Sequence, residues 1–174
     1  MFTSAPVIVA SRITGIVAAG VMAGFSINTS STLMPVLLAS NLSPRRKVQF
    51  WNEWFEKGLP IAKLGIPLSC IPFWLAAYLL PPSAFFSPGK TLGLSTRGQL
   101  IVAGMISFSN LPLSFLFVLP QSVRRLQARM ISLKKDEGEV RDIPEAEAEL
   151  KYFGTACYVR ALAWGGAMVL GIMA

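Results

Sequence analysis

An arginine, Arg160, lies well inside the last of four long apolar stretches of this chain. At 1.5 Å per residue it lies about 10 Å from the start of its stretch. A charge in bilayer hydrocarbon is costly and is usually kept for a site or a partner. A buried guanidinium can stabilise an anion in a pocket of low dielectric constant. The alternative is that Arg160 snorkels to the membrane surface along its own stem.

Other polar side chains share helical faces with spacings of three, four and seven residues. The stripes comprise Ser26, Asn28, Ser30, Ser31 and Thr32 in the first stretch; Lys63, Pro67, Cys70, Trp74 and Tyr78 in the second; Ser107, Asn110, Ser114 and Gln121 in the third; and Tyr152, Ala156, Arg160 and Trp164 in the fourth. We expect Asn28 and Ser114 at the depth of Arg160, so the stripes converge on one polar cavity. Alternatively, the serines and asparagines only form hydrogen bonds between helices.

Residue types that the chain lacks exclude several kinds of chemistry. The chain has no histidine, and all nine carboxylates fall outside the apolar stretches. This removes Ser-His triads, histidine-ligated iron and intramembrane carboxylate relays. Two cysteines alone, Cys70 and Cys157, do not make a zinc or iron–sulfur site. The sequence therefore predicts no metal and no cofactor.

The elements that must position these residues are membrane-spanning helices, each needing about 20 largely apolar residues. The chain has 174 residues, 53% of them hydrophobic and only 14% charged. We predict an all-α integral membrane protein, a single domain over residues 1–174 that forms an antiparallel four-helix bundle. The predicted spans are about 7–34, 59–80, 100–119 and 153–173.

The connecting segments predict how the bundle sits in its membrane. Ser43–Gly58 has helix start and stop signals and clustered Trp and Phe residues, which predict a short interfacial amphipathic helix between the first two spans. The net charge of +7 is concentrated on one side, at Arg45, Arg46, Lys47, Lys57, Arg124, Arg125, Arg129, Lys134, Lys135, Arg141 and Lys151, against Lys90 and Arg97 on the other. Positive loops stay cytosolic, so both termini are expected in the lumen. Anionic lipid headgroups, and not nucleic acid, are the expected partners of this charge.

Four segments together resemble a family of small membrane proteins that contains the fungal anthrone oxygenases. They are AGFSINTSSTLMPVLL in the first span, FWNEWFEKGLPIAKLGIP leading into the second, LSFLFVLPQSVRRLQA at the end of the third, and YFGTACYVRALAWGGAMVLGIM in the last. The resemblance covers nearly the whole chain in order. It implies oxidation of an anthrone-type aromatic polyketide to a quinone by dioxygen, without a cofactor, in secondary metabolite biosynthesis.

The residues of this chain suit the chemistry that the resemblance implies. An anthrone anion reacts directly with dioxygen, so the protein needs only to bind a flat hydrophobic aromatic molecule and favour its anion. We assign Arg160 to the anion, and Tyr158 or Lys63 to proton transfer if burial tunes either group. The alternative for Lys63 is that it snorkels to the membrane surface. We assign substrate binding to Trp74 and Trp164 by stacking, to Asn28 and Asn110 by orienting hydroxyls, and to Ser114 by its depth beside them.

Two other classes of function stay open at this point. The scarcity of titratable groups inside the spans also suits a non-catalytic scaffold or a lipid- or metabolite-binding protein of a biosynthetic complex. Within the same family, a related enzyme could act on another secondary metabolite. A small transporter is disfavoured, because intramembrane carboxylates and inverted repeats are missing. We expect an endoplasmic-reticulum or other endomembrane location, with a homo-oligomer as an open alternative to a monomer.

Overall fold

The computed structural model describes residues 5–81, 93–134 and 143–174, and these segments are helical almost throughout. Lys90, Lys135 and Arg141 lie outside the described residues, as does most of the segment that joins the second and third spans. The elements in order are α1 Ala5–Asn28, η1 Thr29–Leu33, α2 Met34–Ala39, α3 Pro44–Leu79, α4 Thr96–Leu113, η3 Ser114–Val123, α5 Arg124–Lys134 and α6 Ile143–Met173, where η marks π-helix.

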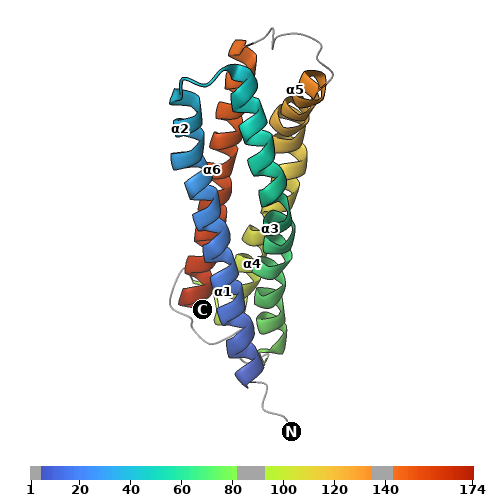
Figure 1. Ribbon diagram of the computed structural model, residues 1–174. Helices are drawn as coiled ribbons and strands as arrows, with labels where there is room; N and C mark the ends of the chain where they lie inside the picture. Colours follow the sequence, from blue (N-terminus) through green and yellow to red (C-terminus); the bar gives the residue numbers. More distant parts are fainter. Residues whose placement is uncertain (1–4, 82–92, 135–142) are drawn as a thin grey trace.

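These elements join into four long rods that run antiparallel to one another (Figure 1). The first rod consists of α1, η1 and α2, and the third of α4, η3 and α5. Among the described residues, four segments are long and apolar enough to cross a membrane: Ala5–Ala39, Pro44–Leu79, Thr96–Ile131 and Glu145–Met173. The fold therefore fits a multi-pass integral membrane protein built as a four-helix bundle, as the sequence predicts.

The rods form a ring in which each has two main neighbours. The first rod packs along α3 and α6, and α4 also packs along both. A helix of 36 residues is roughly 54 Å long at 1.5 Å per residue, whereas hydrocarbon is about 30 Å thick. All four rods are therefore longer than the predicted spans, because hydropathy detects only the apolar part of a helix that continues beyond the membrane.

The segment before the second span differs from the expected separate interfacial helix. Ser43 caps it, its hydroxyl accepting from the Arg46 N–H at 3.4 Å, and the helix then runs without a break to Leu79. Gly58 does not end it, because this glycine lets Phe25 of α1 pack close to the α3 backbone: a Cβ there would lie 3.1 Å from the Phe25 ring. Trp51 is fully buried inside the bundle, so it does not anchor a membrane surface.

The buried apolar residues form two separate clusters along the bundle. One surrounds Trp51, Leu126 and Phe153 near the start of α6, and the other surrounds Phe73, Leu100 and Trp164 toward its end. Phe153 packs edge to face on the Trp51 ring, with the centroids 5.5 Å apart, whereas Trp51 and Phe55 stack at 5.1 Å. On α6, Arg160 lies between the two clusters. Cys157, three residues before it, belongs to the first cluster, and Trp164, four residues after it, belongs to the second; Ala161 beside it is also buried.

Charged contacts hold the two ends of the bundle. At one end, which we call the charged end, Lys47 of α3 pairs with Glu147 of α6 at 2.9 Å and also donates to the Leu38 carbonyl at 2.8 Å. Arg129 of α5 pairs there with Glu149 at 2.9 Å and with Glu145 at 3.0 Å. These contacts fasten all four rods together where the helices extend past their apolar parts.

At the opposite end, Arg12 of α1 closes the last turn of α6. Its guanidinium donates to the Gly171 carbonyl at 2.8 Å and to the Ile172 carbonyl at 2.6 Å. The last carbonyls of a helix have no partner within the helix and carry partial negative charge, so a cation there is favourable. Arg12 is thus a structural residue that links the first and last rods.

Candidate functional site

Arg160 lies on an aromatic platform supplied by its own helix. Trp164 follows four residues later, on the same face of α6, and the Arg160 guanidinium carbon lies 5.0 Å from the centroid of its ring. Trp164 is fully buried, and its indole N–H donates to the Ser69 hydroxyl of α3 at 3.2 Å. The platform is therefore fixed by packing and by a hydrogen bond between helices.

The hydrogen-bonding capacity of Arg160 is incompletely used. Its Nε is buried and has no hydrogen-bond partner among the side chains and backbone that the structure describes. Within residues 5–81, 93–134 and 143–174, no carboxylate forms an ion pair with the guanidinium; Glu145, Glu147 and Glu149 of the same helix pair with Arg129 and Lys47 instead. The side chain thus presents an uncompensated cation to the interior of the bundle, where an anion would be bound strongly.

The space in front of Arg160 is a cavity of about 510 Å³ between α3, the third rod and α6. Ligand pockets commonly have volumes of roughly 300–1,000 Å³. Its lining is mostly apolar and comprises Phe55, Leu59, Ala62, Lys63, Ile66, Pro67, Cys70, Ile71, Trp74, Phe108, Leu111, Ser114, Phe115, Val118, Leu119, Val123, Phe153 and Arg160. We call this cavity the Arg160 pocket.

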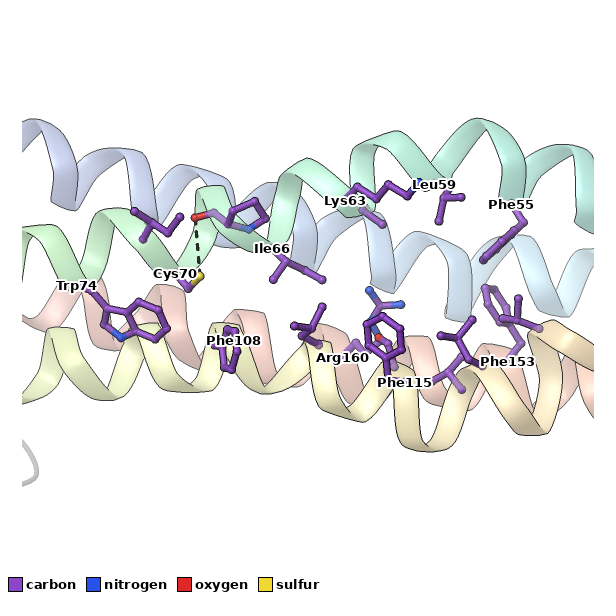
Figure 2. Close-up of a pocket in the computed structure, with 18 residues that line it drawn as sticks. Phe55, Leu59, Lys63, Ile66, Cys70, Trp74, Phe108, Phe115, Phe153 and Arg160 are labelled. Atoms are coloured by element: carbon purple, nitrogen blue, oxygen red, sulfur yellow. Dashed lines mark hydrogen bonds between the residues drawn. The ribbon is translucent and has the colours of Figure 1, made fainter.

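The Arg160 pocket is long, with aromatic rings toward both ends and the cation between them. Figure 2 shows Trp74 and Phe108 toward one end, Phe55 and Phe153 toward the other, and Arg160 in the middle. The Trp74 and Phe108 centroids are 5.7 Å apart, so these rings form one continuous aromatic wall. A flat apolar molecule could lie along the pocket with one oxygen at Arg160.

The structure brings together four of the residues that the sequence singled out: Lys63, Trp74, Ser114 and Arg160. Four of the five residues on the predicted face of the second span line the pocket, since Pro67 and Cys70 join Lys63 and Trp74, whereas the fifth, Tyr78, is exposed and does not. Ser114 donates its hydroxyl proton to the Asn110 carbonyl at 2.6 Å, which leaves its oxygen able to accept a hydrogen bond from a ligand hydroxyl.

Four other predicted residues do not line the Arg160 pocket. Trp164 lies beneath Arg160 and does not reach the cavity, and Asn110 is buried, with its amide donating to the Ser107 carbonyl at 3.2 Å. Asn28 is exposed on the outer surface of α1. Tyr158 is also exposed, in a separate groove between the first rod and α6. The geometry gives Asn28 and Tyr158 no route to a ligand at Arg160.

Four phenylalanines of the pocket were not predicted as site residues from the sequence: Phe55, Phe108, Phe115 and Phe153. A signal was present, since Phe108 and Phe115 are seven residues apart, on the face that also carries Ser114 and Leu111. Phenylalanine is unremarkable in a membrane span, however, because both lipid and core accept it. Only the bundle geometry distinguishes these rings from those that face outward.

A second, much smaller cavity meets the Arg160 pocket on the side of the first rod. It has a volume of about 40 Å³, and Ser26, Thr29, Cys157 and Arg160 are among its lining residues. A space of that size holds about one molecule as small as water. Phe55, Leu59 and Phe153 line both cavities. Arg160 therefore has a large apolar space on one side and room for a small molecule on the other.

The site offers no recognisable metal centre within the described residues. No group of three or more His, Cys, Asp or Glu side chains in residues 5–81, 93–134 and 143–174 is placed to hold an ion. Both cysteines are free, Cys70 in the Arg160 pocket and Cys157 in the smaller cavity.

No family of known proteins, no curated protein and no solved structure matches this chain.

Proposed function

We propose that this protein is a membrane-embedded, cofactor-free oxygenase of the anthrone oxygenase type, which oxidises a flat aromatic polyketide to a quinone with dioxygen. The observation that carries the proposal is the position of Arg160. It presents a cation without a carboxylate partner, and a buried Nε without a hydrogen-bond partner among the described residues, to an apolar pocket of about 510 Å³. Such a pocket suits a hydrophobic ligand that carries, or can form, one negative charge.

The reaction needs only proton removal and a place for the resulting anion. An anthrone loses a proton from its ring CH2 group, and the negative charge moves largely to the carbonyl oxygen. Dioxygen then adds at the carbon to give a hydroperoxide. Loss of water from the hydroperoxide leaves the second carbonyl, so one dioxygen is consumed and one water is released for each quinone formed. The substrate supplies all the electrons.

Five of the residues that line the pocket have assigned roles in this scheme. Arg160 lies beside the enolate oxygen and lowers the free energy of the anion. Trp74 and Phe108 stack on the rings, and the Ser114 oxygen accepts a hydrogen bond from a substrate hydroxyl. Lys63 is assigned as the proton acceptor, since Cys70 and Arg160 are the other titratable side chains that line the pocket. The small cavity beside Arg160 has room for dioxygen or for the water released.

The test is turnover by purified protein in detergent after metal removal, given 1,8-dihydroxyanthrone. Oxygen uptake and quinone absorption are measured against spontaneous oxidation. We expect Arg160→Gln to lower turnover by roughly a hundredfold or more, as loss of one preorganised charge-stabilising donor does elsewhere. The matched control is Arg46→Gln, at an exposed arginine at the start of α3, which is expected to keep wild-type turnover.

A second candidate function is a non-catalytic carrier or scaffold that binds an acidic apolar metabolite. The small number of titratable groups in the pocket favours this function, because proton transfer needs a base. Lys63 is an exposed side chain, and no Asp or Glu is among the residues that line the pocket. Both functions require Arg160-dependent binding of the stable product, 1,8-dihydroxyanthraquinone. Binding without any turnover above the spontaneous rate would select the carrier.

The location follows the same proposal. With the charged end in the cytosol, as the distribution of Lys and Arg favours, the Arg160 pocket lies in the cytosolic half of an endomembrane. Products of a cytosolic polyketide synthase would then meet the bilayer on the side nearer the site.

A further inference from the structure

The third rod separates from α3 beside the Arg160 pocket. α3 packs along α4 and again touches α5, whereas the intervening segment η3 packs against α6. In Figure 2 the α3 ribbon and the α4–η3 ribbon run on opposite sides of the pocket, with the labelled side chains between them. The two helices thus meet at both ends of the pocket and diverge in its middle.

The local sequence explains why the rods part at η3. Pro120 has no N–H to donate and its ring clashes with the carbonyl four residues earlier, which disfavours a regular α-helix at this point, although α3 continues through Pro60, Pro67 and Pro72. The chain instead widens into a π-helix over Ser114–Val123, in which the Arg124 N–H reaches back five residues to the Leu119 carbonyl. Segments of π-helix in proteins are frequent at functional sites.

Side chains at this separation belong both to the pocket and to the outer surface. Ile71 of α3, Phe108 of α4 and Phe115 of η3 line the Arg160 pocket, yet they are 55%, 43% and 61% exposed. The pocket is therefore open sideways between α3 and the third rod. In a spanning bundle this outer surface lies against acyl chains, so the opening faces hydrocarbon and not water.

Lys63 lies at the same opening. Its side chain is exposed and lines the pocket, on the α3 side, while Arg160 lies deeper on α6 (Figure 2). A ligand that passes between the helices meets the Lys63 amine, the assigned proton acceptor, at the rim and the Arg160 cation inside. This order selects an apolar molecule with an acidic hydroxyl or another acidic group over a purely hydrocarbon one.

We infer that the opening between α3 and the third rod is a lateral portal, through which an acidic apolar ligand dissolved in the bilayer reaches Arg160. This inference rests on the proposed function, because it takes the Arg160 pocket to be the binding site. It adds the substrate class, which is a compound taken from the membrane and not from water, and it assigns Ile71 and Phe115 as the residues that limit its passage.

The test compares rates and affinity in phosphatidylcholine vesicles, with 1,8-dihydroxyanthraquinone as the probe and its absorption recorded by stopped flow. Ile71→Trp adds bulk at the rim, and Phe115→Ala removes it. The matched control is Leu68→Trp, also on α3 and 50% exposed, but outside the pocket. Because these positions are exposed, the helix packing of each variant is expected to persist, and gel filtration checks it.

We expect Ile71→Trp to lower the association and the dissociation rate constants in the same direction, each by roughly fivefold, because bulk at the rim slows entry and exit alike. An effect on binding alone would change mainly the dissociation rate constant. Phe115→Ala is expected to raise both, and Leu68→Trp to match the wild type. Wild-type rates in both rim variants, while Arg160→Gln still weakens binding, would overturn the portal and leave the proposed function standing. Absence of Arg160-dependent binding in the wild type would overturn both.

Discussion

Replacing Arg160 with methionine is expected to stabilise this protein while it abolishes ligand binding. Methionine keeps an unbranched apolar stem of similar reach in the same space. The change removes a buried Nε that has no hydrogen-bond partner in the described part of the chain. It also removes the contact between the guanidinium and the Trp164 ring at 5.0 Å. These two effects on the free energy of unfolding have opposite signs.

The magnitudes favour stabilisation. An unsatisfied buried polar group costs about 1–3 kcal/mol, and more when it is charged. A cation over an aromatic ring contributes about 0.5–2 kcal/mol. The difference predicts that Arg160→Met raises the free energy of unfolding by about 1 kcal/mol. A residue that a protein keeps at a cost to its stability is expected at a functional site.

Arg12→Met is the matched comparison, because Arg12 is also an arginine on an apolar helix but has its partners. It donates to the Gly171 and Ile172 carbonyls at 2.8 and 2.6 Å. Loss of these charge-assisted bonds is expected to lower the free energy of unfolding by about 1–2 kcal/mol. Both variants are measured by reversible unfolding in mixed micelles with increasing dodecyl sulfate, followed by far-UV circular dichroism.

The opposite signs make the comparison decisive. If Arg160→Met is destabilised to the same extent as Arg12→Met, Arg160 is a structural residue, and the argument that it is held ready for an anion fails. If it is stabilised but still binds 1,8-dihydroxyanthraquinone with wild-type affinity, the guanidinium is not part of the binding site.

Three further predictions concern the proton acceptor, the charged end and the pocket wall. Lys63→Met is expected to slow anthrone turnover by roughly a hundredfold, as loss of a general base does, while the quinone still binds; unchanged turnover would remove Lys63 from proton transfer. Arg129→Gln is expected to lower the free energy of unfolding by about 3 kcal/mol, because it leaves the buried carboxylate of Glu149 without its ion-pair partner. Glu145→Gln, at a side chain that is 70% exposed, is expected to lower it by only roughly 0–1 kcal/mol. Equal losses in dodecyl sulfate titrations would refute this account of the ion pairs. Gly104→Ala is expected to weaken quinone binding roughly tenfold, since the added Cβ would overlap the Trp74 indole and overpacking costs about 1–3 kcal/mol. Gly166→Ala is the control and is expected to bind the quinone normally, because a Cβ at Gly166 has no neighbouring atom within 4 Å. Equal Kd values in the two variants would contradict the assignment of Trp74 to the pocket wall.

The sequence predicts the number and order of the spans because apolar length alone specifies them. It does not predict their ends. Gly58 suggests a helix stop, but in the bundle Gly58 provides close contact with Phe25, and the helix continues. A local stop signal is overridden here because tertiary packing supplies more favourable contacts than a helix end would.

The candidate site is predicted in part, and the residues that fail share a physical reason. Lys63, Trp74 and Ser114 are correctly grouped with Arg160 because their faces also carry small or aromatic residues that pack inward. Asn28 is misplaced because lipid and core are equally apolar, so the sequence of a span contains little information on which side faces the bundle. Its neighbour Thr29 is fully buried instead.

The most direct test of the central claim is the ionisation state of the bound substrate. 1,8-Dihydroxyanthrone is mixed with the protein under argon, where oxidation cannot follow, and its absorption spectrum is recorded. We expect the spectrum of the anthrone anion to appear with the wild type and to be absent with Arg160→Gln. If the bound anthrone stays neutral in the wild type, or if its anion forms equally well without the Arg160 guanidinium, the account of this site is contradicted.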